Sequence, residues 1–220
     1  MARYRAVLFD WRGTLVQNPD AEWCITRALR SLDRSIEPRA VEAAVQGLAT
    51  AGELPEILET ERHEDCSAEL HRSVTMRRFE LAGLDDELAN ALYRIDAEPT
   101  THPLYPDVPE VLSAIRDRGS RLVLVSDIHH DIRVDLAGYG IGHLIDACVL
   151  WFEHGFQKPD VRMFALALEA AEAEPGDALM VADRASHDGG AAEAGITTLI
   201  LPPPMDAGPR GLDIVLRLLR

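Results

Sequence analysis

Five short apolar runs recur along this chain, and helical patterns separate them. Apolar runs of this length, bounded by turn residues, fit strands that are buried on both faces. Strands that alternate with helices form a parallel sheet with helices on both faces, so we predict an α/β fold. The predicted strands are residues 6–9, 121–125, 148–150, 179–181 and 198–201, and the helices that follow them are residues 109–118, 132–139, 161–173, 189–194 and 213–219.

One long segment, from about Val16 to Leu104, interrupts this alternation and contains almost no β-rich run. Its apolar residues recur at helical spacing, and prolines lie near the expected helix ends. We therefore expect a Rossmann-like core domain formed by residues 1–16 and 105–220, with an all-α domain over residues 17–104. The helices expected in the all-α domain are residues 20–32, 39–51, 54–61, 67–79 and 85–95.

The charge balance limits the partners of the chain, because 22 basic residues face 37 acidic ones and the formal net charge is −15. A strongly acidic protein repels phosphate backbones and anionic lipid headgroups, so neither nucleic acid nor a membrane surface is an expected partner. The N-terminal apolar run is interrupted by Asp10 and Arg12 and lacks the apolar core of a signal peptide. We expect a cytoplasmic protein; the sequence predicts no oligomeric state.

Side chains that can carry chemistry follow the predicted strands. Asp10, Ser126 and Asp183 come after three of them, Lys158 lies in the segment after another, and Asp188 follows Asp183 by five positions. Each alone is equally typical of a turn or a helix cap, but the carboxyl ends of parallel strands meet at one edge of a sheet. A carboxylate that attacks a phosphate dianion needs a hard cation with oxygen ligands and a positioned ammonium. Asp10, Asp183 and Lys158 supply that combination.

The order of these residues resembles the haloacid dehalogenase-like (HAD) superfamily over the whole chain. The shared pattern is a strand followed by Asp-x-x-Gly-Thr-Leu, a helical cap, a strand ending in Ser, a Lys-Pro-Asp segment, and a strand followed by two acids. The resemblance implies that Asp10 is a nucleophile that forms a covalent intermediate, usually an aspartyl phosphate. It also implies that Ser126 hydrogen-bonds the transferred group and that Lys158 neutralises charge on Asp10 and the substrate.

The resemblance further implies a Mg²⁺ site. Asp10 and Asp183 would supply carboxylates, and Arg12 would supply its backbone carbonyl. The second acid of the last motif would support the metal from its outer shell. Asp188 fits the longer of the two spacings that the family allows, whereas counting back from the next glycine turn points to His187, so we favour Asp188 and keep His187 as its competitor.

Arg12 departs from the family pattern, in which phosphatases carry a second Asp at this position. That Asp protonates the leaving group and then activates water, which a guanidinium cannot do because it does not lose a proton near neutral pH. Loss of general acid–base help typically costs about 10²–10⁴-fold in rate. The Arg12 guanidinium either binds a carboxylate or a second phosphate of the substrate with its parallel N–H donors, or it turns away from the site. In the second case the protein has little or no turnover.

Two relatives that also lack this Asp differ elsewhere. The string DWRGT, which begins at Asp10, resembles phosphonoacetaldehyde hydrolase, but that enzyme needs a cap lysine for a Schiff base. The single lysine of this chain, Lys158, lies outside the helical segment. The 2-haloacid dehalogenases carry Asn after the Ser of the second strand and Asn in the last motif, where this chain has Asp127 and Asp183.

The sequence therefore predicts a Mg²⁺-dependent phosphatase that acts on a small phosphorylated metabolite through an aspartyl phosphate at Asp10. The alternatives are a non-catalytic or very slow phosphate binder and a carbon-centred hydrolase of the dehalogenase kind. The turn after Asp10 can point backbone N–H groups at a phosphoryl oxygen. The expected substrate contacts are Trp11, Arg12, Gly13, Thr14 and Asp127, although a core-packing role is equally open for Trp11.

Overall fold

The computed structural model describes residues 3–61, 68–204 and 208–220. The chain divides into two compact units. One consists of Met1–Gln17 and Pro103–Arg220 and is called the core unit; the other is Asn18–His102 and is called the helical unit. Along the described ranges, no helix is both long enough and apolar enough to span a membrane.

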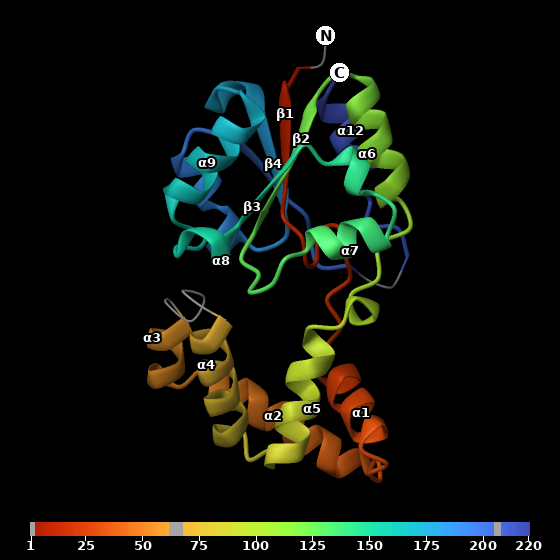
Figure 1. The fold of residues 1–220 in the computed structure, drawn as a ribbon, viewed down its shortest axis with the longest axis vertical. Coiled ribbons are helices and arrows are strands. Elements are labelled where there is room, and N and C mark those ends of the chain that lie inside the picture. Colours follow the sequence, from red (N-terminus) through yellow and green to blue (C-terminus); the bar gives the residue numbers. More distant parts are fainter. Residues whose placement is uncertain (1–2, 62–67, 205–207) are drawn as a thin grey trace. The chain divides into compact units, whose positions relative to one another are not determined.

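The core unit is built on a parallel sheet of five strands (Figure 1). These are β1 (Ala6–Phe9), β2 (Arg121–Ser126), β3 (Ala147–Leu150), β4 (Ala178–Ala182) and β5 (Thr197–Ile200). Their order is β3-β2-β1-β4-β5. The chain adds β2 and β3 on one side of β1 and then β4 and β5 on the other, so the strand order reverses between β1 and β4. Ligands of open α/β sheets bind outside the carboxyl ends of the strands at such a reversal.

Both faces of the sheet are covered, which explains why its strands read as continuous apolar runs. Val7 and Phe9 pack with α6 (Val108–Asp117), α7 (Arg133–Gly138) and α12 (Asp213–Leu218) on one face. Ala6 and Leu8 pack with α8 (Trp151–His154), α9 (Val161–Ala171) and α11 (Gly190–Glu193) on the other (Figure 1). Successive side chains of a strand point to opposite faces, so one short strand serves two hydrophobic cores. The predicted fold class, α/β with a Rossmann-like parallel sheet and helices on both faces, is confirmed.

The helical unit has its own hydrophobic core, which includes Ile25, Val41 and Leu92. Its helices are α1 (Ala21–Ser31), α2 (Pro38–Gly52), α3 (Pro55–Glu61), α4 (Ala68–Leu81) and α5 (Asp86–Asp96). The side chain of Asp20 accepts a hydrogen bond from the backbone N–H of Trp23 and caps α1, as N-terminal aspartates do. The five helices predicted for this segment are present, with ends that agree to within two residues; residue 67, where the fourth predicted helix begins, lies outside the described residues.

Short helical turns complete the described structure. They are α10 (Ala185–Asp188) and the 3₁₀ turns Pro99–Thr101, Gly142–Leu144 and Pro175–Asp177. Neither α8 nor α10 is predicted from the sequence, whereas α11, which is equally short, lies within the predicted helix 189–194. The omission of α10 matters because this helix carries both His187 and Asp188.

Candidate active site

Asp10 and Lys158 form a buried ion pair at the carboxyl end of the central strand. Lys158 Nζ lies 2.7 Å from Asp10 Oδ1, and the two residues are 2% and 7% exposed. The hydroxyl of Thr14 donates to Asp10 Oδ2 at 3.1 Å, so both carboxylate oxygens are held. Burial raises the pKa of the Asp10 carboxyl, and the nearby Lys158 ammonium limits that rise.

Lys158 is surrounded by further carboxylates. Its Nζ donates to Asp188 Oδ1 at 2.6 Å and lies 3.9 Å from Asp127 Oδ2. Burial lowers the pKa of the ammonium, but the carboxylates of Asp10, Asp127 and Asp188 together outweigh burial and leave that pKa raised. The lysine is therefore held in its charged form beside the carboxylate that the sequence assigns as the nucleophile.

Asp127 holds the Lys158 segment in place. Its Oδ1 accepts a hydrogen bond from the backbone N–H of Lys158 at 2.9 Å. Burial, the largest influence, raises the pKa of Asp127 to about 6. Asp127, an expected substrate contact, thus hydrogen-bonds the loop that carries the Lys158 ammonium.

The loop after β1, residues 10–16, is called the β1 loop. The carbonyl of Trp11 accepts hydrogen bonds from the backbone N–H groups of Leu15 and Val16, at 2.8 and 3.1 Å. Gly13 has a φ of 76°, and a β-carbon at this position would lie 2.1 Å from Asp183 Oδ2. Only glycine fits both the left-handed backbone and the close approach of the carboxylate.

Asp183 emerges from the end of β4 next to this loop. Its Oδ1 is buried and has no hydrogen-bond partner among the described residues. Burial, followed by the charges of Asp10 and Asp188, raises the pKa of Asp183 to about 6. The carboxyl groups of Asp10, Asp127 and Asp188 surround the Lys158 ammonium, and the unpartnered buried carboxylate oxygen of Asp183 favours a bound cation.

Asp188 and His187 point to different partners. Asp188 is fully buried, and its Oδ2 accepts a hydrogen bond from the backbone N–H of Arg184 while its Oδ1 contacts Lys158. The His187 ring instead lies 3.0 Å from the Arg184 guanidinium and 2.9 Å from the Ser186 hydroxyl. Burial and the Arg184 charge lower the pKa of His187 to about 4, so its ring is neutral at physiological pH. Of the two competitors, Asp188 is the one that contacts Lys158.

Three other residues expected at the site lie in different environments. Ser126 is the last residue of β2 and is buried at the same edge of the sheet. Arg12 is half-buried, and its backbone bridges to Val16. The Trp11 ring is 2% exposed and lies 6.3 Å, centroid to centroid, from the Tyr139 ring. The Trp11 ring is packed into the hydrophobic core, and contact between Trp11 and substrate stays a prediction.

Arg210 is a further buried residue next to the β1 loop, and no sequence motif predicts its position there. The residue is 6% exposed, and its guanidinium donates from Nε to the carbonyl of Gly13 at 2.6 Å. The two residues are 197 positions apart, and the proline- and glycine-rich segment around Arg210 contains no recognisable motif. A buried arginine is nevertheless bonded to the β1 loop.

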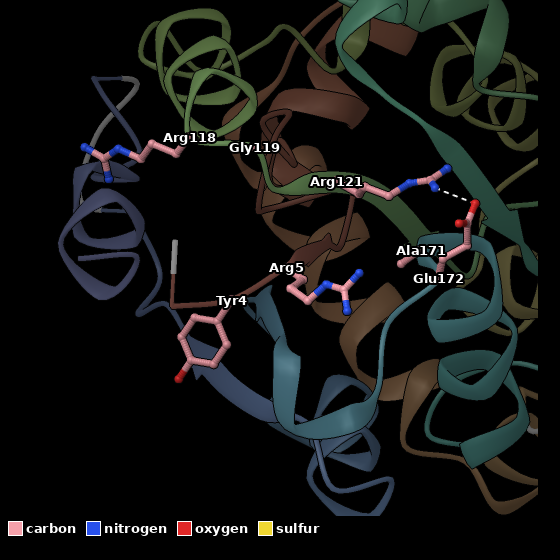
Figure 2. Close-up of a pocket in the computed structure, with 7 residues that line it drawn as sticks. All are labelled: Tyr4, Arg5, Arg118, Gly119, Arg121, Ala171 and Glu172. Carbon is pink, nitrogen blue, oxygen red and sulfur yellow. Dashed lines mark hydrogen bonds and ion pairs between the residues drawn. The ribbon is translucent and has the colours of Figure 1, made fainter. Parts of the chain in front are cut away.

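A cavity of about 560 Å³ lies elsewhere, at the amino ends of β1 and β2 (Figure 2). Three arginines line it, but Arg121 is paired with Glu172 at 2.6 Å and Arg118 donates to the carbonyl of Leu216. Figure 2 shows the Arg118 side chain extending away from Arg121. This cavity is at the opposite edge of the sheet from Asp10 and has no part in the site.

Comparisons with known proteins agree with this arrangement. Residues 4–195 match the family model for haloacid dehalogenase-like hydrolases. The human protein called haloacid dehalogenase-like hydrolase domain-containing protein 3 is 28% identical over 221 residues, which cover 97% of this chain and 86% of that protein. The phosphoserine phosphatase of Thermus thermophilus is 38% identical over 103 residues, 46% of this chain but only 40% of the phosphatase. The Bacillus subtilis protein YfnB, in a magnesium-bound crystal form, has a TM-score of 0.75 at 19% identity and 99% coverage of both chains. The chain belongs to the haloacid dehalogenase-like hydrolase family, as the order of its motifs predicts.

Proposed function

We propose that this hydrolase is a Mg²⁺-dependent phosphatase that acts on a small phosphorylated metabolite. The observation that carries the proposal is the buried pair of Asp10 and Lys158 at the end of the central strand, next to the unpartnered carboxylate of Asp183. Two relatives support it by their names, the phosphoserine phosphatase and the glyceraldehyde 3-phosphate phosphatase of Methanothermobacter thermautotrophicus.

The residues present fit a magnesium ion. Within the described residues, no three side chains of His, Cys, Asp or Glu come together as a ready metal site. Mg²⁺ does not require one, because it usually binds one or two carboxylates and keeps several waters. Asp10 and Asp183, with the backbone carbonyl of Arg12, would hold it, and Asp188 would act indirectly through Lys158. When bound, the ion would supply positive charge that offsets the repulsion between the Asp10 carboxylate and the phosphoryl group.

The chain's own residues perform the remaining steps. An Asp10 oxygen forms a bond to phosphorus while the bond from phosphorus to the leaving oxygen breaks. The Lys158 ammonium keeps Asp10 ionised despite its burial, and the Ser126 hydroxyl would hydrogen-bond the transferred group. Water then attacks the phosphorus of the aspartyl phosphate, which releases phosphate and restores the carboxylate.

The leaving oxygen of an alkyl phosphate takes up a proton as it departs, and because Arg12 cannot provide that proton, it comes from solvent water. Substrates whose leaving group is stable without a proton are therefore favoured over simple alkyl phosphates. This feature also supports the second candidate function, a slow or non-catalytic phosphate binder.

A panel of phosphorylated metabolites, assayed with and without Mg²⁺, tests the proposal. We expect phosphate release that requires Mg²⁺ and is lost in Asp10→Asn. Asp177→Asn is a matched control, because Asp177 precedes β4 at the opposite edge of the sheet. Tight binding of beryllofluoride without phosphate release would instead establish a binder, and release of halide without Mg²⁺ would establish a carbon-centred hydrolase.

A further inference from the structure

We propose that Arg210 is a positioning residue for the β1 loop. Arg210 belongs to none of the motifs that define the site, and it precedes α12 near the end of the chain. Its Nε donates to the carbonyl of Gly13 at 2.6 Å, and the residue is only 6% exposed. A charged donor thus reaches the loop that carries Asp10, from a segment 197 residues further along the chain.

Some backbone groups of the β1 loop bond one another, whereas the carbonyl of Gly13 accepts its hydrogen bond from Arg210. The N–H of Gly13 donates to the carbonyl of Val16 at 2.8 Å, and the carbonyl of Trp11 accepts from Leu15 and Val16. The carbonyl of Gly13 is instead satisfied by Arg210. Buried backbone carbonyls need a partner, and hydrogen bonds from charged donors are stronger than neutral ones.

Arg210 is itself fixed from two directions. The carboxylate of Asp107 accepts the backbone N–H groups of Arg210, Gly211 and Leu212, at 2.7, 2.9 and 2.9 Å. The guanidinium lies over the Tyr105 ring, 5.7 Å from its centroid, within the range of a cation–π contact. A guanidinium anchored in this way has little freedom to follow a moving loop, so it restrains the loop.

The position of Gly13 explains how this restraint reaches the reacting groups. Gly13 packs directly against Asp183, and its neighbours in the chain are Arg12 and Thr14. Arg12 presents the carbonyl that the proposed function assigns to Mg²⁺, and Thr14 holds Asp10 Oδ2. A shift at Gly13 therefore displaces a metal ligand and the nucleophile together.

The burial of Arg210 also carries a cost. Its Nη2 is buried and has no hydrogen-bond partner among the described residues. An unpaired buried donor is unfavourable, and such local violations are expected where a residue serves a site rather than stability. This second observation separates Arg210 from an arginine that merely completes the packing.

Two variants separate the hydrogen bond from the packing. Arg210→Met keeps the length of the side chain and removes the donor, whereas Arg210→Lys keeps a charged donor. Because a displacement of about 1 Å costs about 10²-fold in rate, we expect kcat to fall by about 10²-fold in Arg210→Met, with KM nearly unchanged and substantial recovery in Arg210→Lys. Arg217→Met, on the exposed side of α12, is the matched control and should behave like the unmodified protein.

A readout without turnover keeps the test independent of the proposed function, on which the kinetic part rests. Emission from Trp11, isolated by Trp23→Phe and Trp151→Phe, reports the β1 loop, and calorimetry reports Mg²⁺ binding. We expect Arg210→Met to shift the emission and weaken Mg²⁺ binding, and Arg210→Lys to restore both. If the unmodified protein releases no phosphate, the proposed function fails, while the fluorescence still decides the role of Arg210.

Unchanged Trp11 emission, Mg²⁺ affinity and kcat in folded Arg210→Met would overturn the proposal. So would equal losses in the Met and Lys variants accompanied by equal losses of thermal stability, because these would mark a purely structural residue. If Arg210→Met does not fold, Asp107→Ala decides, since it frees the backbone of Arg210 and keeps the guanidinium. Folded Asp107→Ala with a normal kcat and normal emission would then contradict the proposal, and a lowered kcat with shifted emission would support it.

Discussion

Asp183 lies directly against Gly13, so that a β-carbon on Gly13 would be 2.1 Å from Asp183 Oδ2. The contact joins the loop after β1 to the carboxylate after β4, across the reversal in strand order. It couples the proposed nucleophile loop to the proposed metal ligand, and it makes the absence of a side chain at position 13 a requirement of the site.

Gly13→Ala is expected to abolish Mg²⁺ binding and phosphate release, because the new methyl group displaces the Asp183 carboxylate. Gly119→Ala is the matched control. Gly119 has a φ of 85°, close to the 76° of Gly13, but no atom lies within 4 Å of its β-carbon position. Each alanine should lower the free energy of unfolding by about 1–2 kcal/mol because of the left-handed backbone, as measured by chemical denaturation. Only Gly13→Ala should lose Mg²⁺ affinity, as measured by calorimetry. Equal Mg²⁺ affinity in the two variants would refute the coupling.

The stability of the metal-free protein is expected to depend on pH through Asp183 and Asp127. Burial raises the pKa of each from 3.8 to about 6. A carboxyl with a raised pKa in the folded state stabilises the fold at pH values below 3.8, and this contribution is lost as the pH rises through 6. Urea denaturation should therefore show a falling free energy of unfolding over this interval.

Added Mg²⁺ should reverse that loss, because it binds ionised carboxylates. The gain in the free energy of unfolding is expected above pH 6 and should shrink below it, and Asp183→Asn should remove it. A gain that is equal on both sides of pH 6, or that survives Asp183→Asn, would show that Mg²⁺ does not bind at Asp183.

Lys158→Arg is expected to damage the site although it preserves the charge. Lys158 is 2% exposed, and its Nζ lies 2.7 Å from Asp10 and 2.6 Å from Asp188. A planar guanidinium is larger and has a different donor geometry, so the free energy of unfolding should fall by about 1–3 kcal/mol through overpacking, as measured in urea. Phosphate release should be lost as well; normal activity in this variant would contradict the assigned role of the lysine.

The strands and the longer helices could be predicted because each leaves a repeated pattern of apolar residues. The motif residues could be placed together because parallel strands end at one edge of the sheet, and the structure does join Asp10 to Lys158. Motif spacing favours Asp188 over His187 but does not exclude His187. The choice between them depends on which side of the four-residue helix α10 faces the lysine, and no periodic signal exists at that length.

The sequence did not decide two other features, for different reasons. Arg210 reaches Gly13 across 197 positions, and nothing in the proline- and glycine-rich segment near it marks it as buried. Trp11 follows the proposed nucleophile, yet its ring turns into the core towards Tyr139. Adjacency in sequence does not fix the direction of a side chain in an irregular loop, because that direction is set by tertiary packing.

Arg12→Asp is expected to raise the rate at which alkyl phosphates are hydrolysed, by up to the factor of about 10²–10⁴ that is typical of general acid–base catalysis. The dependence of kcat/KM on the pKa of the leaving group should be steep in the unmodified protein and shallow in the variant. Arg118→Asp, which places the same side chain on an exposed arginine at the opposite edge of the sheet, controls for the change in charge. An unchanged or lower rate in Arg12→Asp would contradict the conclusion that a missing acid limits turnover.

The most direct measurement is the mass of the peptide that contains Asp10, after the protein has reacted with a phosphorylated substrate and Mg²⁺ and been quenched with acid. Because Arg12 cannot activate the water that hydrolyses the intermediate, the aspartyl phosphate should accumulate. We expect one added phosphoryl group on Asp10, dependent on Mg²⁺ and absent in Asp10→Asn. Phosphate release with an unmodified Asp10, continuing in Asp10→Asn, would contradict the covalent mechanism.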